Sequence, residues 1–254
     1  MIKIIVCGAA GRMGNEIIDI AKTIPDIRVI AGIESAGSKL VGTTIGDVKI
    51  LGDIHKVIDD ADCVVEFTNH ESTIENLNRV KDYKKPYVIG TTGFSESELK
   101  GINDLAKKFP ILLSPNMSLG VNHLYNLIKA TVATLPDYDL EIIETHHRAK
   151  KDAPSGTAKA IIRIISESRP NTKFIYGREG IIGERKKGEV GINAVRGGDI
   201  IGEHRVLFLG DGEFIELRHY ATSRRCFASG TIAAIRFIIT KGPGLYSIKD
   251  LLKQ

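Results

Sequence analysis

The sequence predicts an α/β fold in which a doubly wound parallel sheet is accompanied by an α+β domain with a mixed sheet. Three observations support this class. A glycine-rich loop directly follows the first apolar run, short apolar runs alternate with helical patterns through the first half, and strand patterns joined by glycine turns take over after about residue 137. The chain has 254 residues, 43% hydrophobic and 26% charged, which excludes disordered, collagen-like and coiled-coil chains.

The first half reads as strands and helices in alternation. Five short runs are mainly apolar without regular polar alternation, which is typical of strands buried on both faces of a parallel sheet. These runs are residues 2–7, 28–33, 63–67, 87–89 and 111–113. Helical patterns lie between them at residues 14–23, 72–83 and 96–109, and the spacing of Ser95 and Glu98 predicts a capping box for the last helix. The succession predicts a Rossmann-like sheet.

The second half has a different pattern. Strand-like runs occupy residues 139–145, 206–209 and 214–220, with turn signals at 197–199 and 210–212. One clear helix is expected at residues 157–168, and another at 226–240 that returns to the first domain. The turn-rich segments 178–180 and 194–204 are interpreted as structural links and oligomer contacts.

Charge and cysteine content indicate which kinds of partner and which compartment to expect. A formal charge of +4 is too dilute for a nucleic-acid partner. Three cysteines stand far apart in apolar stretches, which indicates reduced thiols, and none has zinc spacing. The chain opens with a strand pattern instead of a secretory signal, and no apolar run approaches the ~20 residues that span a bilayer. We therefore expect a cytoplasmic protein with no membrane partner.

The loop after the first strand is the first candidate site. It runs Gly8-Ala9-Ala10-Gly11-Arg12-Met13-Gly14, a G-x-x-G-x-x-G pattern before a predicted helix. Glycines there let the backbone approach a pyrophosphate at the helix N-terminus, and Arg12 adds a positive charge. The pattern predicts dinucleotide binding, with an ordinary tight turn as the alternative.

An acidic residue and two further loops extend this candidate site. Glu34 stands at the end of the second strand, 20 residues beyond Gly14, where a carboxylate can accept hydrogen bonds from ribose hydroxyls and repel a 2′-phosphate. The loops Gly90-Thr91-Thr92-Gly93 and Ser114-Pro115-Asn116-Met117-Ser118 follow later strands. Ligands bind beyond the carboxyl ends of such strands, so both loops are expected to line a nicotinamide pocket, although each could be a plain turn.

The second candidate site is the segment 144–157, Glu-Thr-His-His-Arg-Ala-Lys-Lys-Asp-Ala-Pro-Ser-Gly-Thr. Its two histidines, one arginine and two lysines indicate either a site that binds an anion or a role in acid–base catalysis. Ser155, Gly156 and Thr157 open a helix and are expected to offer free N–H groups and hydroxyls to an anion. The pattern favours a small di-acid substrate and general acids that protonate it as a hydride arrives. A solvated basic loop is the alternative, and metal binding by adjacent histidines is not expected.

These motifs together resemble the 4-hydroxy-tetrahydrodipicolinate reductase (dihydrodipicolinate reductase) family of lysine and diaminopimelate biosynthesis. The similarity covers essentially the whole chain, and its carriers are segments 8–14, 90–93, 144–157 and 196–204. The resemblance implies a dinucleotide-binding domain at residues 1–117 and 225–254, and a substrate-binding and tetramerisation domain at residues 118–224. It also implies hydride transfer from NADH or NADPH to a cyclic dicarboxylate, with loss of water, in a homotetramer.

The resemblance also implies roles for single residues. His146 would exchange a proton and Lys150 would donate one, while His147, Gly156 and Thr157 would bind substrate. The cofactor positions that it implies are Gly8, Ala9, Ala10, Gly11, Arg12, Met13, Glu34, Gly90, Thr91, Thr92, Ser114, Pro115, Asn116 and Met117.

The choice between the two cofactors is predicted from departures from the family pattern. Ser35 and Asn69 replace arginines that serve the 2′-phosphate in NADPH-using relatives. Together with Glu34, these residues predict a preference for NADH, which Arg12 or Lys39 could offset. Two other functions stay open from the residues alone: a different two-domain dehydrogenase of an amino or hydroxy di-acid, and a non-catalytic NAD(H)-sensing protein.

Overall fold

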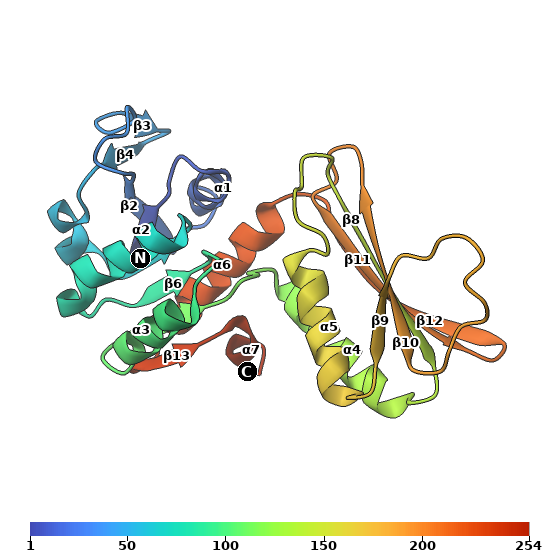
Figure 1. Cartoon of the computed structure of the whole chain (residues 1–254). Helices are drawn as coiled ribbons and strands as arrows, with labels where there is room; N and C mark the ends of the chain where they lie inside the picture. The colour runs from blue at the N-terminus through green and yellow to red at the C-terminus, as the bar shows by residue number, and fades with distance from the viewer. Residues whose placement is uncertain (254) are drawn as a thin grey trace. The chain divides into compact units, whose positions relative to one another are not determined.

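A computed structural model describes residues 1–253 and divides into two compact units. Unit 1 comprises Met1–Leu119 and Arg224–Gln254, and unit 2 comprises Gly120–Ser223. Unit 1 is therefore assembled from both ends of the chain, and unit 2 is inserted between them. Each unit is built around one main sheet with helices packed on it (Figure 1).

The sheet of unit 1 confirms the predicted doubly wound topology. Its strand order is β13-β7-β6-β5-β1-β2-β4-β3, and every neighbouring pair is parallel except β3 and β4. The strands are β1 (Ile2–Cys7), β2 (Ile27–Ile33), β3 (Thr44–Ile45), β4 (Val48–Leu51), β5 (Cys63–Glu66), β6 (Tyr87–Ile89), β7 (Pro110–Leu113) and β13 (Gly244–Tyr246). The chain reverses its direction of travel across the sheet at β1, between β2 and β5. Such a switch point is where open α/β sheets bind ligands.

Helices cover both faces of this sheet because its central strands are apolar on both sides. Ile4 and Val6 of β1 join a core with α1 and α6, whereas Ile5 and Cys7 join a core with α2 and α3. The helices are α1 (Arg12–Ala21), α2 (His70–Val80), α3 (Glu96–Ala106), α6 (Arg225–Ile238) and α7 (Ile248–Leu251), with short 3₁₀ turns η1 (Ile54–Lys56), η2 (Ile58–Asp60) and η3 (Lys81–Tyr83). The alternation of side chains along each strand thus places two hydrophobic layers back to back.

The predicted capping box of α3 is confirmed. The Glu98 amide donates to Ser95 Oγ (3.3 Å), and the Ser95 amide donates to Glu98 Oε2 (2.7 Å). These two bonds satisfy backbone donors that a helix start leaves without partners. The cap therefore sets where α3 begins.

Unit 2 has the predicted mixed sheet, in the order β12-β11-β8-β10-β9. Strands β8 (Asp139–His146), β9 (Lys173–Tyr176) and β10 (Glu189–Arg196) run parallel to one another. Strand β11 (Gly202–Gly210) pairs antiparallel with β8 on one side and with β12 (Glu213–Ala221) on the other. Buried Leu140 and Ile142 alternate with partly exposed Glu141 and Ile143 along β8. Their buried face packs with residues of α4 (Leu119–Thr134) and α5 (Gly156–Ser168).

The helix expected at residues 157–168 is confirmed as α5, whereas α4, which precedes the sheet, was not predicted. Buried Val121, Leu124, Ile128 and Val132 follow helical spacing on this helix. Its other positions carry few charges, so polar residues do not outline a solvent-facing side in the sequence. The short strands β3, β4, β9 and β13 and the long β10 were likewise not predicted.

None of the helices formed by residues 1–253 combines the length and apolar character needed to cross a membrane.

Close packing of α6 against the segment after β7 makes Gly230 a stability determinant. A Cβ atom at Gly230 would lie 1.8 Å from the carbonyl oxygen of Met117. We expect Gly230→Ala to lower the free energy of unfolding by about 1–3 kcal/mol, since helix and segment must move apart. Urea denaturation measures the change.

Gly101→Ala is the matched control for this substitution. Gly101 also lies inside a helix, but a Cβ there meets no atom within 4 Å. We expect this variant to gain up to about 1 kcal/mol from helix propensity. Equal stability of the two variants would contradict the packing argument.

Candidate functional site

The glycine loop lies at the end of β1 and faces a groove in unit 1. The turn spans residues 8–11 and α1 begins at Arg12, with Gly11 as the N-cap. Because Gly11 has no side chain, it offers no acceptor to the first amides of the helix, and these amides can bind an anion. The groove has a volume of about 570 Å³. Its lining residues are Gly8, Gly11, Ile33, Glu34, Ser35, Ala36, Gly52, Phe67, Thr68, Asn69, Ser72, Glu75, Asn76 and Arg79.

Glu34 joins the second strand to the glycine loop. It follows β2 directly, and its Oε1 accepts a hydrogen bond from the Ala10 amide (2.7 Å). This bond fixes the loop against the strand end and keeps the carboxylate beside the groove. An acid at this position was predicted from the sequence, but the bond by which one of its oxygens holds the loop was not.

The positively charged side chain that lines the groove is not one of those expected from the sequence. Arg12 and Lys39 are not among its lining residues, whereas Arg79 of α2 is. The Arg79 guanidinium lies 3.1 Å from the Glu75 carboxylate, one turn earlier on the same helix. Sequence reasoning missed this pair because i,i+4 ion pairs are common on exposed helix faces.

The two later loops follow β6 and β7 at the same edge of the sheet, yet their residues do not line the groove. Thr91 is buried and accepts a hydrogen bond from the Thr73 hydroxyl of α2 (3.0 Å). The Ser114 hydroxyl donates to the Asn116 carbonyl (2.8 Å), and Met117 is part of the hydrophobic core. Both loops are thus locked by internal contacts at the strand ends.

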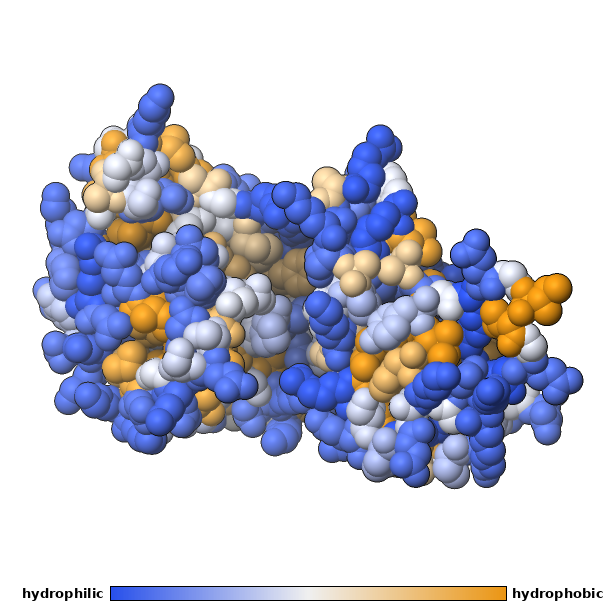
Figure 2. All heavy atoms as spheres, in the orientation of Figure 1, coloured by the Kyte–Doolittle hydropathy of each residue, from blue (hydrophilic) through white to orange (hydrophobic). Residues whose placement is uncertain are grey.

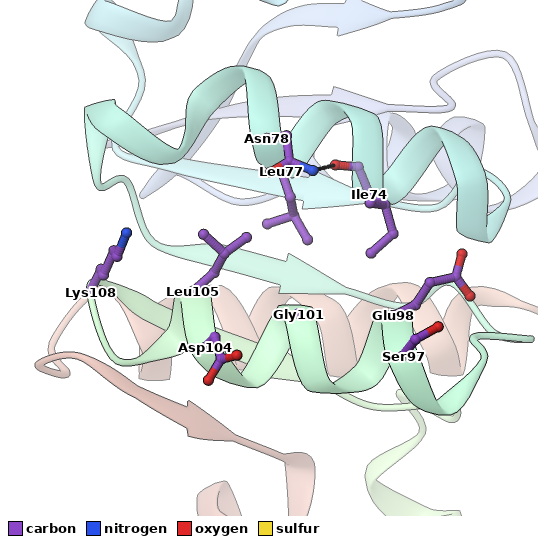
Figure 3. A pocket seen from close by; sticks show the side chains of 9 residues that line it. All are labelled: Ile74, Leu77, Asn78, Ser97, Glu98, Gly101, Asp104, Leu105 and Lys108. Carbon is purple, nitrogen blue, oxygen red and sulfur yellow. Dashed lines mark hydrogen bonds between the residues drawn. The ribbon is translucent and has the colours of Figure 1, made fainter.

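A second pocket in unit 1 has no relation to the predicted residues. It lies between α2 and α3, has a volume of about 400 Å³, and is drawn in Figure 3. Leu77 and Leu105 face each other across it, while the carboxylates of Glu98 and Asp104 stand on its α3 side. Those acids make it a poor site for a pyrophosphate.

In unit 2, the end of β8 carries a buried polar cluster. Glu144 is fully buried, and its Oε2 lies 2.5 Å from Nδ1 of the buried His146. Arg196, the last residue of β10, forms a two-pronged ion pair with the same carboxylate: Nη1 donates to Oε2 (2.8 Å) and Nη2 to Oε1 (2.7 Å). The Ser155 amide donates to Oε1 (3.0 Å). Burial alone would raise the pKa of Glu144, but its bonds to His146 and Arg196 lower that pKa to about 2.

His204 lies on the other side of this cluster, on β11. Its ring meets the ring of His146 edge to face, with 5.2 Å between centroids, and its Nε2 is 2.9 Å from the Ser155 hydroxyl. Burial, and then the neighbouring His146, lower the pKa of His204 to about 3. His204 is therefore a neutral part of the cluster at physiological pH.

The other predicted residues of unit 2 lie in the loop after β8 and at the start of α5. Lys150 is partly buried, with Nζ 2.8 Å from Asp152 Oδ1. The His147 amide donates to the Ile200 carbonyl (2.7 Å). Gly156 and Thr157 form the first turn of α5, and the Thr157 hydroxyl bonds to Tyr125 of α4. The structure thus gathers His146, His147, Lys150, Gly156 and Thr157 around one strand end.

One part of the expected anion site is wrong. Ser155 was expected to offer a free N–H group and hydroxyl, but it is buried, its amide is bonded to Glu144, and its hydroxyl accepts from the Ala158 amide (3.2 Å). The hydroxyl caps the helix instead of facing solvent. The candidate anion donors at this helix start are therefore the backbone amides of its first two residues, Gly156 and Thr157.

Arg196 and His204 were not predicted as members of this cluster, and Glu144 and Ser155 lie in the predicted segment 144–157 but were not assigned the contacts that they make. Arg196 and His204 belong to the segment 194–204 that was interpreted as structural, whereas both contact the cluster. A signal was available, since Glu144 and His146 share strand parity with the apolar Leu140 and Ile142 and so point to the same buried face. An acid placed there requires a cation from a neighbouring strand.

Among residues 1–253, no group of three His, Cys, Asp or Glu side chains is arranged to hold a metal ion.

Comparisons with known proteins cover the whole chain. The model described as dihydrodipicolinate reductase, N-terminus, matches residues 2–117, and that for the C-terminus matches residues 120–252. A 4-hydroxy-tetrahydrodipicolinate reductase from Geobacter metallireducens is 44% identical, over 99% of this chain and 99% of its own length. One from Aquifex aeolicus is 42% identical, over 99% and 98%.

Solved structures agree with these matches. A dipicolinate-bound dihydrodipicolinate reductase from Paenisporosarcina sp. TG-14 superposes with a TM-score of 0.81 and 25% identity, over 98% of this chain and 99% of that chain. A probable dehydrogenase from Thermotoga maritima has a TM-score of 0.67 at 15% identity, over 98% and 92%. The second likeness shows a shared fold and no more.

The neutral, buried His204 predicts a specific pH dependence of stability. An unfolded histidine has a pKa near 6.5, while that of folded His204 is about 3, so between these values only the unfolded state binds the proton. The free energy of unfolding should therefore fall as pH drops below about 6.5, by up to about 1.4 kcal/mol per pH unit. His204→Gln should lose less stability than the wild type between pH 7.5 and 5.5 in urea denaturation.

His55→Gln provides the control, because His55 is exposed on unit 1. Its stability should follow the wild-type pH dependence. If His204→Gln also follows it, His204 is not the residue that resists protonation.

Proposed function

The chain belongs to the dihydrodipicolinate reductase family, and we propose that its two units divide the family's reaction between them. The activity is that of a 4-hydroxy-tetrahydrodipicolinate reductase, an NAD(P)H-dependent oxidoreductase of lysine and diaminopimelate biosynthesis. It reduces a cyclic hydroxy-dicarboxylate to tetrahydrodipicolinate with loss of water. Unit 1 binds the nicotinamide cofactor, and the end of β8 in unit 2 handles the dicarboxylate and its proton.

The groove of unit 1 fits a dinucleotide. Backbone of the loop Gly8–Met13 and the uncapped start of α1 bind its pyrophosphate, with the Arg12 charge nearby. When bound, the reduced nicotinamide supplies the hydride. The loops after β6 and β7 complete the nicotinamide end through the backbone of residues 90–92 and 114–117, since Thr91, Ser114 and Met117 are buried.

Charge in the same groove supports NADH as the preferred cofactor. Glu34 keeps a carboxylate beside the groove, with Ser35 and Asn69 in place of cations. A carboxylate accepts hydrogen bonds from both ribose hydroxyls and repels a 2′-phosphate. Arg79 is the one cation in the groove lining, and Glu75 already neutralises it.

The observation that carries the catalytic part of the proposal is the cationic segment beside the N-terminus of α5. His147 is half-buried, Lys150 is partly buried, and the exposed Gly156 begins the helix. One substrate carboxylate binds the amides of Gly156 and Thr157, and His147 contacts the other. Lys150 donates the proton that accompanies hydride addition, and His146 exchanges a proton through its ring.

Unit 2 also supports the homotetramer that the family resemblance implies. Helices α4 and α5 pack on one face of its sheet, and large apolar side chains remain exposed elsewhere on the unit, among them Tyr176, Phe214 and Tyr220. Figure 2 shows apolar surface on unit 2 beside polar residues. Exposed apolar surface of this kind favours self-association. A cytoplasmic location, where reduced nicotinamide cofactors are held, belongs to the same proposal.

Lys150→Ala tests the catalytic assignment. We expect kcat to fall at least about 100-fold, because general acid catalysis contributes this much, with little change in the Kd of NADH. A coupled assay with freshly made substrate gives kcat, and fluorescence titration gives the Kd. Lys151→Ala removes the adjacent, exposed lysine as a control and should stay within a few-fold of the wild type. Turnover by Lys150→Ala at the level of the control would show that Lys150 is not the acid.

A second prediction concerns the cofactor. Wild-type kcat/KM should be higher with NADH than with NADPH, and Ser35→Arg should raise kcat/KM for NADPH about tenfold by pairing with the 2′-phosphate. Ser38→Arg adds the same charge outside the lining of the groove and should leave the ratio nearly unchanged. Equal or better use of NADPH by the wild type would overturn the preference.

A further inference from the structure

The fully buried carboxylate of Glu144 carries a large desolvation penalty. A buried charge destabilises the fold unless it is fully paired, and an apolar side chain would fill the same space with a smaller penalty. All of its bonds lead into the site: the guanidinium of Arg196, Nδ1 of His146 and the amide of Ser155, which precedes the substrate-binding helix. The location of these partners points to a role beyond packing.

Arg196 also connects Glu144 to Lys150, the second proton-transfer group of the proposed function. Its Nη2 donates to the Asp152 carbonyl oxygen (2.7 Å) as well as to Glu144. The Asp152 carboxylate in turn lies 2.8 Å from the Lys150 ammonium. Parallel pairing of β8 and β10 places Arg196 directly opposite His146, so one guanidinium reaches both the strand end and the loop after it.

We propose that the Glu144–Arg196 ion pair is the positioning element of the active site, orienting His146 directly and Lys150 through Asp152. The assignment rests on the proposed function, in which His146 and Lys150 exchange protons with substrate. Glu144 and Arg196 are positioning residues, since their contacts are with the groups that act.

The contact with Glu144 selects one form of the His146 ring. A carboxylate can only accept, so Nδ1 carries the hydrogen and Nε2 is left to exchange a proton. Gly202 leaves space beside that second nitrogen, because a Cβ atom at this position would lie 3.1 Å from Nε2. Carboxylate and glycine thus act on opposite ends of the same ring.

A purely structural ion pair between β8 and β10 would have different consequences. Its loss would lower stability, whereas the ring tautomer and the ratio of kcat to KM would stay the same. Glu141 supplies the matched control, because it lies on the same strand, on the other face, and pairs with Arg178 (2.9 Å) and with Arg185. Glu141→Gln therefore removes a carboxylate ion pair from β8 away from His146.

The decisive experiment combines kinetics with ¹⁵N NMR of histidine-labelled protein. We expect Glu144→Gln to lower kcat about 100-fold, as loss of a carboxylate that orients a functional histidine does elsewhere, with substrate KM and NADH Kd within about threefold of the wild type. His146 should be the Nδ1–H tautomer in the wild type and in Glu141→Gln, and a mixture in Glu144→Gln. Arg196→Lys should retain more kcat than Arg196→Ala.

Each outcome decides between the two roles. An unchanged tautomer or a kcat within threefold of the wild type in Glu144→Gln overturns the proposal. Should Glu144→Gln fail to fold, Glu144→Asp keeps the charge but withdraws it from Nδ1, and the same two readouts apply. The NMR measurement needs no substrate, so a wild type that fails to turn over substrate would refute the proposed function, while the tautomer of His146 in Glu144→Gln would still test the role of the ion pair.

Discussion

The pairing of a buried carboxylate with a guanidinium organises unit 2. Glu144 can be buried at the end of β8 only because Arg196 meets it in a two-pronged geometry and the Ser155 amide satisfies a remaining lone pair. Those requirements account for otherwise unrelated features: parallel pairing of β10 with β8, the path of the loop from residue 147 to residue 155, and the point at which α5 begins. Removing the guanidinium would leave the fully buried carboxylate without its two-pronged partner.

Unit 1 obeys a different constraint, the topology of its sheet. Because strand order reverses at β1, the loops after β1 and β5 diverge and leave a groove at the carboxyl edge. The apolar strands themselves carry no chemistry. They set the positions of loop backbone, and Glu34 adds a hydrogen bond that holds the glycine loop in place. Loop backbone and one acid therefore shape this groove.

The two units use polar groups in different ways. In unit 1 the groove is lined by loop backbone and by side chains at strand ends and on α2. In unit 2 charged and polar side chains occupy a strand end, with His146, Glu144 and His204 buried beside one another. Burial makes the electrostatic effects there strong, so that Glu144 stays ionised and His204 stays neutral.

Local patterns in the sequence determined much of this protein. Apolar runs specified the parallel sheet, the Ser95 and Glu98 spacing specified a helix start, and the motifs at residues 8–14 and 144–157 indicated the family. Helix α4 was missed because its apolar residues lack a clearly outlined polar face. The cluster around Glu144 was only partly visible, because Arg196 and His204 lie 52 and 60 residues further along the chain. Which cation neutralises a buried acid depends on strand pairing, so the tertiary structure alone decided that Arg196 and Ser155 hold Glu144 and that Arg79, not Arg12, lines the groove of unit 1.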